Sequence, residues 1–234
     1  ATSRQIDNTL YNNSVEEQQG YGYQFWRLPH NGFATLGMGS QSAYCYPGQD
    51  LIVVVNGDTQ PKGYAGGQLI QGVYDYLFPA LSEEPLEADG EAQDALCRYI
   101  RTAEIAPAPG ESRSPTAALV SGSTYRMTEN DMHITSLRFD FAGDAVNLHW
   151  ENDVGGHDVL YGLGRSVPQA FPESRYGLTQ IGRPEGRGLD CIASAGWVDE
   201  NSLYTNVWIT DVGMGSLRMQ FVFDGDTVTM LADK

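Results

Sequence analysis

The stretch Leu203-Tyr204-Thr205-Asn206-Val207-Trp208-Ile209-Thr210 alternates two kinds of side chain along its length, and this alternation decides the fold of the larger part of the chain. Successive side chains of a β-strand point to opposite faces, so a two-residue period predicts a strand with one buried face. The same period recurs in residues 137–141, 146–150 and 217–223, with glycine and acidic turns between the segments. Residues 116–234 are therefore predicted to form an antiparallel β domain, either a meander or a small barrel.

The N-terminal third has a different pattern, which predicts an α+β layer. Aromatic side chains alternate over residues 21–26, a second strand is expected over 33–46, and the β-branched run 51–55 predicts a central strand buried on both faces. Residues 64–78 place Leu and Val at helical spacing before Pro79. Three antiparallel strands and one covering helix are expected, with one sheet edge open and one sheet face uncovered.

The two parts are joined by a helix and a proline-rich segment, which we assign to residues 83–115. The helix is expected over residues 88–102, with Ala92, Leu96 and Tyr99 among the residues facing inward. Residues 106–115 contain three prolines, a composition typical of an extended linker.

Composition excludes several classes of function. The chain has 234 residues and a formal net charge of −16, so it lacks the basic surface that a nucleic-acid or polybasic membrane-binding protein needs. Its longest apolar run, Leu51 to Val55, is too short for a membrane span or a signal-peptide core. Three scattered cysteines predict buried thiols rather than a disulfide framework, which favours a cytoplasmic location.

Motifs for nucleophilic or metal chemistry are absent from the sequence. The chain contains no Gly-x-Ser-x-Gly elbow, and neither of its two lysines follows a serine by three residues, since Thr59 and Leu231 occupy those positions. His149, Glu151 and Asp158 lie around an acidic turn, but glycines occupy the positions where a calcium loop needs oxygen ligands. No cofactor and no metal are predicted.

A combination of segments resembles the C-terminal end of a known family, the penicillin-recognising serine hydrolases, which include class C β-lactamase-like esterases and amide hydrolases. The segments are Tyr21-Gly22-Tyr23-Gln24-Phe25-Trp26, then Gly37-Met38-Gly39-Ser40-Gln41, then Pro47-Gly48-Gln49-Asp50 with the strand after it. The resemblance covers residues 1–82, as the C-terminal portion of a β-lactamase-like domain. The region from 116 resembles an extra C-terminal domain that some bacterial members carry.

The resemblance implies a substrate-binding role for one short segment. Met38, Gly39 and Ser40 match the family's third active-site box, and Gln41 comes directly after it, where the family uses a backbone N–H as an oxyanion donor. Met38 replaces the family's cation, so it cannot attract a substrate carboxylate. The family's Ser-x-x-Lys and Tyr-x-Asn boxes lie upstream of this region, so we expect them in a part of the parent protein before Ala1.

These observations lead to two hypotheses for function. In the first, the chain is the C-terminal fragment of a serine hydrolase-like protein, inactive by itself because the nucleophile and its base are missing. Its partners are then the missing N-terminal part and, through the open sheet edge, a second copy of the chain. In the second, the β domain is a lipocalin-like module that binds a small molecule in a cavity lined by Trp150, Trp197 or Trp208.

Overall fold

The structure is a computed structural model that describes residues 1–9, 16–37, 39–57, 59, 66–173, 189–211 and 215–233. The chain divides into two compact units, Ala1–Tyr99 and Ile100–Lys234, and each is described by itself. Most of the regular structure is β-strand, as the alternating pattern predicts.

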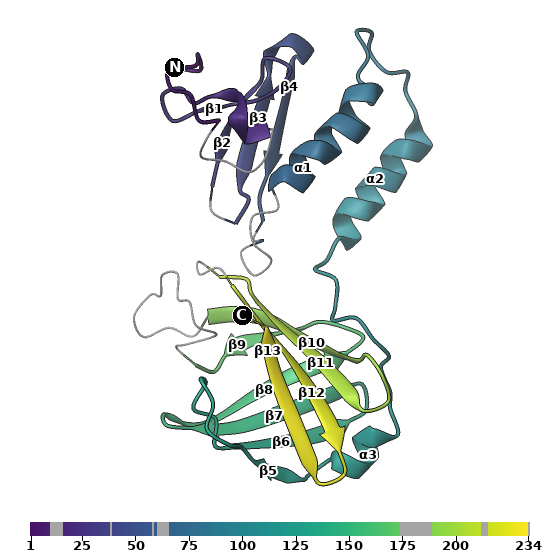
Figure 1. The fold of residues 1–234 in the computed structure, drawn as a ribbon. Coiled ribbons are helices and arrows are strands. Elements are labelled where there is room, and N and C mark those ends of the chain that lie inside the picture. The colour runs from purple at the N-terminus through teal and green to yellow at the C-terminus, as the bar shows by residue number, and fades with distance from the viewer. Residues whose placement is uncertain are drawn as a thin grey trace. The chain divides into compact units, whose positions relative to one another are not determined.

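The first unit contains an antiparallel sheet of four strands in the order β1-β2-β3-β4 (Figure 1). The sequence predicts three strands because it takes residues 33–46 as one. The structure instead breaks this segment at Gly37–Gln41, where Gly39 and Ser40 both have positive φ and the chain reverses. The strands are β1 (Trp26–Arg27), β2 (Phe33–Leu36), β3 (Ser42–Tyr46) and β4 (Leu51–Val55).

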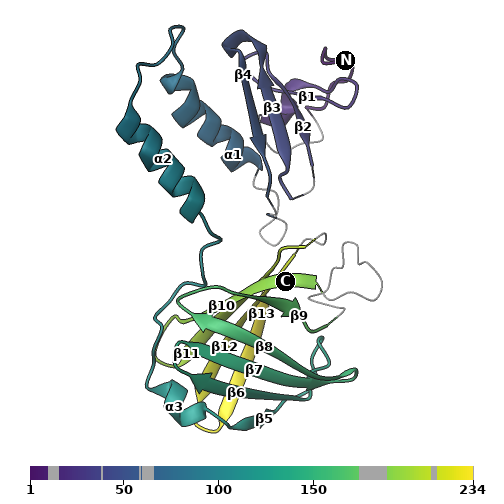
Figure 2. The same cartoon turned by 180° about the vertical axis from the view of Figure 1, so that it is seen from behind.

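One face of this sheet carries the core of the unit. Ala34, Tyr44 and Tyr46 are buried in one cluster with Ile70 and Val73 from the segment after the sheet. That segment is helix α1 (Gly66–Gly72), which lies beside the sheet in both cartoon views, followed by a π-helical turn, Val73–Leu77, and a 3-10 turn, Phe78–Ala80 (Figures 1 and 2).

The π-helical turn changes which side chains meet the sheet. A regular helix over 64–78 places Tyr76 and Leu77 on the apolar face, but both are exposed in the structure. Tyr74 and Phe78 pack against the core instead, and both rings contact the ring of Tyr46. The wider π-turn rotates the later residues relative to a 3.6-residue period, so the predicted face is wrong after Val73.

The opposite face of the sheet carries a row of apolar side chains. Phe33, Cys45 and Ile52 occupy matched positions on β2, β3 and β4. Ile52 is 69% exposed and Val54, two residues further along the same strand, is 65% exposed. The prediction that residues 51–55 form a central strand buried on both faces is therefore wrong, because β4 is the last strand of the sheet and only one of its faces packs on the core. Because alternate residues of a strand share a face, the exposed side chains form an apolar surface that is uncovered among the described residues.

Helix α2 (Gly90–Thr102) agrees with the predicted position but not with the predicted burial. Asp89 caps its first turn, accepting a 2.9 Å hydrogen bond from the N–H of Ala92. The expected inward face, which includes Leu96, Tyr99 and Ile100, is exposed to solvent. The apolar pattern of this helix predicts its secondary structure correctly and its packing wrongly.

The proline-rich segment, predicted to be a linker, is bonded to the rest of the second unit. The N–H of Ala108 donates a 2.9 Å hydrogen bond to the buried Ser194 hydroxyl, and Glu111 pairs with Trp197 through two backbone hydrogen bonds. Gly110 lies so close to this strand that a Cβ there would be 2.5 Å from the carbonyl oxygen of Trp197. The segment therefore belongs to the second unit and packs on its strand Leu189–Trp197, and helix α3 (Thr116–Val120) comes after it.

The second unit is a nine-stranded, nearly closed barrel-like sheet (Figures 1 and 2). Its main path runs β13-β12-β11-β10-β8-β7-β6-β5, with antiparallel pairs except for a short parallel contact between β8 and β10. This confirms the prediction of a barrel-like β domain. The strands are β5 (Thr124–Arg126), β6 (Ser136–Ala142), β7 (Ala145–Asn152), β8 (Gly155–Leu163), β9 (Val167–Phe171), β10 (Leu189–Trp197), β11 (Ser202–Ile209), β12 (Ser216–Asp224) and β13 (Thr227–Asp233).

Strand β9 lies in residues 165–187, a stretch in which Pro168, Pro172 and Pro184 interrupt the strand pattern and predict a long loop. Residues 167–171 pair antiparallel with β10, so this first part of the expected loop is a strand. Pro168 is tolerated because β9 pairs with β10 alone among the described strands, which leaves its other edge without a ladder. The remainder of the expected loop, residues 174–188, lies outside the described residues.

The barrel interior is filled by large side chains. Phe139 contacts Phe221 and Phe223 at ring-centroid distances of 4.9 and 5.2 Å, and Trp197 contacts Phe141 and Phe223. These rings belong to a single buried cluster with side chains from nearly every strand of the barrel. The buried aromatic and aliphatic side chains of this cluster together provide the hydrophobic core of the unit.

Candidate functional site

Of the four residues that the family resemblance selects, the structure describes Gly39, Ser40 and Gln41, which lie in the turn between β2 and β3. The N–H of Gly37 donates to the carbonyl of Gln41 at 2.7 Å, and the N–H of Ser40 donates to the carbonyl of Gly37 at 3.1 Å. Gly39 and Ser40 have φ values of 82° and 69°, a left-handed conformation that costs a serine roughly 1–2 kcal/mol. Met38 lies outside the described residues.

This turn is bonded to the segment after β4. The Ser40 hydroxyl lies 2.7 Å from the Thr59 hydroxyl, and the N–H of Thr59 donates to the carbonyl of Gly39 at 3.1 Å. The Gln41 side-chain amide donates to the carbonyl of Gly57 at 3.0 Å. Three hydrogen bonds therefore fix the position of the turn at one end of the sheet.

The chemistry available to Ser40 is that of a structural hydroxyl. Ser40 is only 1% exposed, and its partner Thr59 is another neutral hydroxyl rather than a general base. A serine nucleophile needs an adjacent base and access to substrate. The arrangement can fix backbone groups around Gly39 and Gln41, but it does not activate the Ser40 oxygen for attack.

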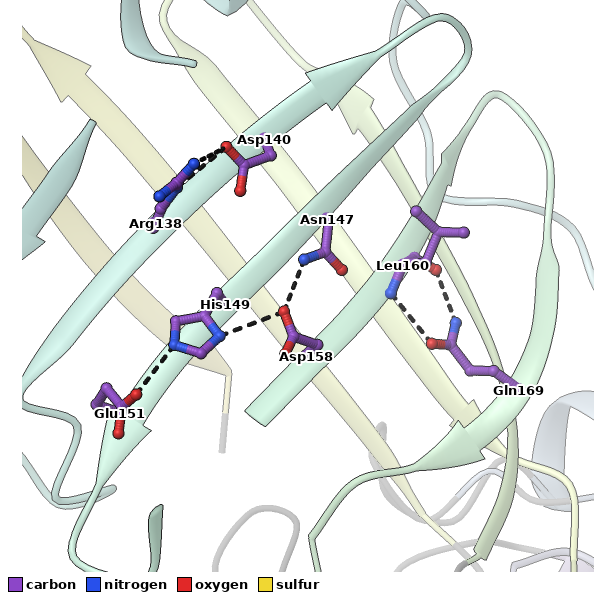
Figure 3. Close-up of polar contacts among 8 residues, drawn as sticks. All are labelled: Arg138, Asp140, Asn147, His149, Glu151, Asp158, Leu160 and Gln169. Carbon is purple, nitrogen blue, oxygen red and sulfur yellow. Dashed lines mark hydrogen bonds and ion pairs between the residues drawn. The ribbon is translucent and has the colours of Figure 1, made fainter. Parts of the chain in front are cut away.

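A second polar cluster lies on the outer face of the barrel, where His149 stands between two carboxylates (Figure 3). Nε2 of His149 on β7 lies 3.1 Å from Oε1 of Glu151, and Nδ1 lies 3.2 Å from Oδ1 of Asp158 on β8. Partial burial opposes the charged imidazolium, but the hydrogen bonds and charges of the two carboxylates outweigh it and raise the pKa of His149 above its ordinary value. A hydrogen bond from Asn147 lowers the pKa of Asp158.

Next to this cluster, the side chain of Gln169 replaces a missing strand pair (Figure 3). Its amide donates to the carbonyl of Leu160 at 2.7 Å and its carbonyl accepts from the Leu160 N–H at 3.0 Å. Strand β8 pairs with β10 only at Gly162 and Leu163. Gln169 therefore supplies hydrogen-bond partners for the backbone N–H and carbonyl of Leu160, which precede that short contact. The role of Gln169 is structural.

A third polar cluster surrounds Glu173 where β7 ends and β8 begins. The indole N–H of Trp150 and the side-chain amide of Asn152 each donate to Oε1 of Glu173 at 2.6 Å. Nε2 of His157 lies 3.3 Å from the same oxygen, and the His157 ring stacks on Trp150 at 5.4 Å. The side chains of His157 and Glu173 are 11% and 14% exposed, so this carboxylate is largely shielded from water.

The three tryptophans of the β domain do not gather around one cavity. Trp150 and Trp197 are buried at 4% and 2% exposure, and both make ring contacts inside the barrel. Trp208 is only partly buried and lies on the face of β11 opposite the buried Val207. This packing favours a core role for Trp150 and Trp197 over the lining of a ligand pocket.

Burial favours the neutral forms of two ionisable groups inside the barrel, Cys191 and Tyr161. Burial raises the pKa of the Cys191 thiol to about 11, and burial also raises the pKa of Tyr161. A thiol with so high a pKa is a poor nucleophile at neutral pH. Neither group is a candidate for acyl transfer.

Two further features are absent from the part of the chain that the structure describes. These residues contain no group of three or more His, Cys, Asp or Glu side chains placed to hold a metal ion. No helix in the described ranges combines the length and apolar character needed to cross a bilayer.

Comparison with known proteins adds no assignment. No protein-family model matches the chain, and no curated protein matches its sequence. A functional proposal therefore rests on the sequence resemblance together with the geometry of the described residues.

The sequence finds some of these groups and misses others. It singles out Ser40 and Gln41 through the family motif, and it notes His149 and Asp158 because they flank an acidic turn. It misses Glu173, which is 23 residues from Trp150, and the pairing of Ser40 with a residue 19 positions away. No local spacing signals such pairs, because only the pairing of strands brings them together.

Proposed function

We propose that residues 1–82 are the C-terminal portion of a penicillin-recognising serine hydrolase domain, and that the β domain is an accessory to it. In this proposal the Gly39–Gln41 turn borders an active site whose nucleophile and general base belong to a part of the protein outside residues 1–234. The chain by itself is then not a catalyst, and its substrate is an unidentified ester or amide.

The uncovered face of the four-stranded sheet carries this proposal. Helix α1 and the turns after it supply core side chains for one face only, whereas Ile52 and Val54 on the other face are more than half exposed. Soluble proteins rarely leave a contiguous apolar surface without a partner. A sheet layer whose second face is covered by another part of the same enzyme accounts for this surface.

The fixed turn supports the same proposal. A left-handed, buried Ser40 is conformationally unfavourable, and three hydrogen bonds to Gly57 and Thr59 maintain it. Strained turns of this kind are common where backbone groups must be placed for a ligand. Backbone placement is also what an oxyanion hole requires, independent of the residue that replaces the family's cation.

The first test is the reactivity of the purified chain. Residues 1–234 are expected to hydrolyse neither nitrocefin nor short p-nitrophenyl esters, and to gain no covalent adduct from a penicillin or a fluorophosphonate in intact-protein mass spectrometry. Ser40→Ala serves as the matched variant. An adduct on a defined serine, or turnover that Ser40→Ala abolishes, contradicts the proposal.

The second test is the reading frame upstream of Ala1. A Ser-x-x-Lys motif there, at the start of a predicted helix, supports the proposal because it supplies the nucleophile and base together. A reading frame that contains no such motif contradicts it.

A further inference from the structure

Strand β4 has one edge without a partner among the described strands. It pairs with β3 along its whole length, from Ser42↔Val55 to Tyr46↔Leu51, and it is the last strand in the order of the sheet. The N–H and C=O groups on its outer edge form an extended hydrogen-bonding surface that another strand can pair with.

This edge lacks the features that usually protect edge strands. Natural proteins place charged side chains, proline or a β-bulge at such edges to prevent pairing with another chain. Strand β4 is Leu-Ile-Val-Val-Val, it contains no charge and no proline, and its register with β3 is continuous. Ile52 and Val54 add exposed aliphatic side chains beside the unpaired backbone.

The sequence of β4 is complementary to itself in the antiparallel direction. Pairing about a twofold axis at Val53 places Ile52 opposite Val54 of a second copy and Leu51 opposite Val55 of that copy. Each face of the joined sheet then continues with aliphatic neighbours, and cross-strand pairs of this kind are favourable. A symmetric interface needs this property, because the same patch must serve both subunits.

The uncharged edge limits the electrostatic cost of pairing two copies. Each chain has a formal net charge of −16, which opposes association, and an interface made by an uncharged strand adds no like-charge contact of its own. In the twofold register Asp50 faces Asn56 of the other copy, and the two Asp50 side chains lie at opposite ends of the paired strands. An uncharged strand gives a charged partner protein no electrostatic contact to recognise.

We infer that the chain of residues 1–234 forms a twofold dimer in which β4 pairs antiparallel with β4 of a second copy. Four strands from each copy then make one continuous sheet across the dimer. The inference depends only on the open edge and the sequence of β4, so it stands or falls separately from the hydrolase proposal.

Light scattering coupled to size-exclusion chromatography tests the dimer with the full chain at micromolar concentration in physiological salt. The expected mass is twice the chain mass of 25.6 kDa. Val54→Lys puts a charge beside the paired edge and is expected to raise the dissociation constant at least about tenfold, giving a monomer. Leu231→Lys is the matched control, because Leu231 is 53% exposed on β13, an edge strand of the other sheet.

Hydrogen exchange provides a second readout that does not need a variant. The amides of residues 51–55 are expected to become more protected as protein concentration rises, while those of β13 do not change. A monomeric mass for the unmodified chain overturns the inference. A dimer that survives Val54→Lys in a protein with unchanged circular dichroism also overturns it, as does a dimer that Leu231→Lys alone disrupts.

Discussion

Glu173 is expected to stabilise the barrel more than any exposed acidic residue of the chain. Its carboxylate accepts 2.6 Å hydrogen bonds from the indole of Trp150 and the amide of Asn152. Glu173→Ala removes both bonds at once. Trp150 is 4% exposed, so its N–H cannot easily find water instead.

The magnitude is set by the two donors. A buried N–H left without an acceptor costs about 1–3 kcal/mol, and the bond from the less buried Asn152 adds about 1 kcal/mol. Glu173→Ala is therefore expected to lower the free energy of unfolding by about 2–4 kcal/mol. Glu173→Gln keeps an acceptor oxygen but loses the charge, so its effect should be about half as large.

Urea unfolding followed by tryptophan fluorescence measures this effect, because three of the four tryptophans belong to the second unit. Glu129→Ala is the matched control, since Glu129 is exposed and is expected to change stability by less than about 0.5 kcal/mol. If the effect of Glu173→Ala is also below about 0.5 kcal/mol, Glu173 does not satisfy the buried indole, and the reasoning about this cluster is refuted.

Two further predictions concern charge and sterics in the second unit. The two carboxylate partners raise the pKa of His149, so the charged imidazolium stabilises the fold below about pH 6.5, the ordinary histidine pKa, and this stabilisation is lost as the pH rises through the raised pKa. His149→Gln should remove up to about 1 kcal/mol of this pH dependence of the free energy of unfolding between about pH 5.5 and 8. An unchanged pH profile in urea unfolding would contradict the prediction. Gly110→Ala should lower the free energy of unfolding by at least about 2 kcal/mol more than Gly122→Ala. Both glycines have positive φ, but only at Gly110 would the new Cβ lie 2.5 Å from the carbonyl oxygen of Trp197. Equal melting temperatures for the two variants would show that the backbone around Gly110 moves aside without loss of stability.

The sequence predicts secondary structure well where a local pattern is strong. Alternation over residues 203–209 and 217–223 matches strands β11 and β12, and the β-branched run 51–55 is strand β4. It fails at residues 33–46, where a hairpin replaces one long strand. The reversal depends on the left-handed conformation of Ser40, which the contact with Thr59 supports.

Burial is the property that the sequence predicts least well. The apolar pattern of α2 gives the correct helix, but its Leu96 and Tyr99 are 53% and 71% exposed. The π-helical turn at Val73–Leu77 similarly exchanges Tyr76 for Tyr74 at the sheet. A hydrophobic period identifies a face that is able to pack, but only the tertiary structure decides whether another element covers it.

By itself, the sequence determined the periodicity of the strands, the excess of acidic charge and the absence of a Ser-x-x-Lys motif, because each is a property of neighbouring residues or of a sum over the chain. The tertiary structure alone decided which distant groups meet, Ser40 with Thr59 and Trp150 with Glu173, and which edge of the first sheet stays open at β4. The physical reason is that strand pairing and chain reversal set these distances, and both depend on contacts between residues far apart in the chain.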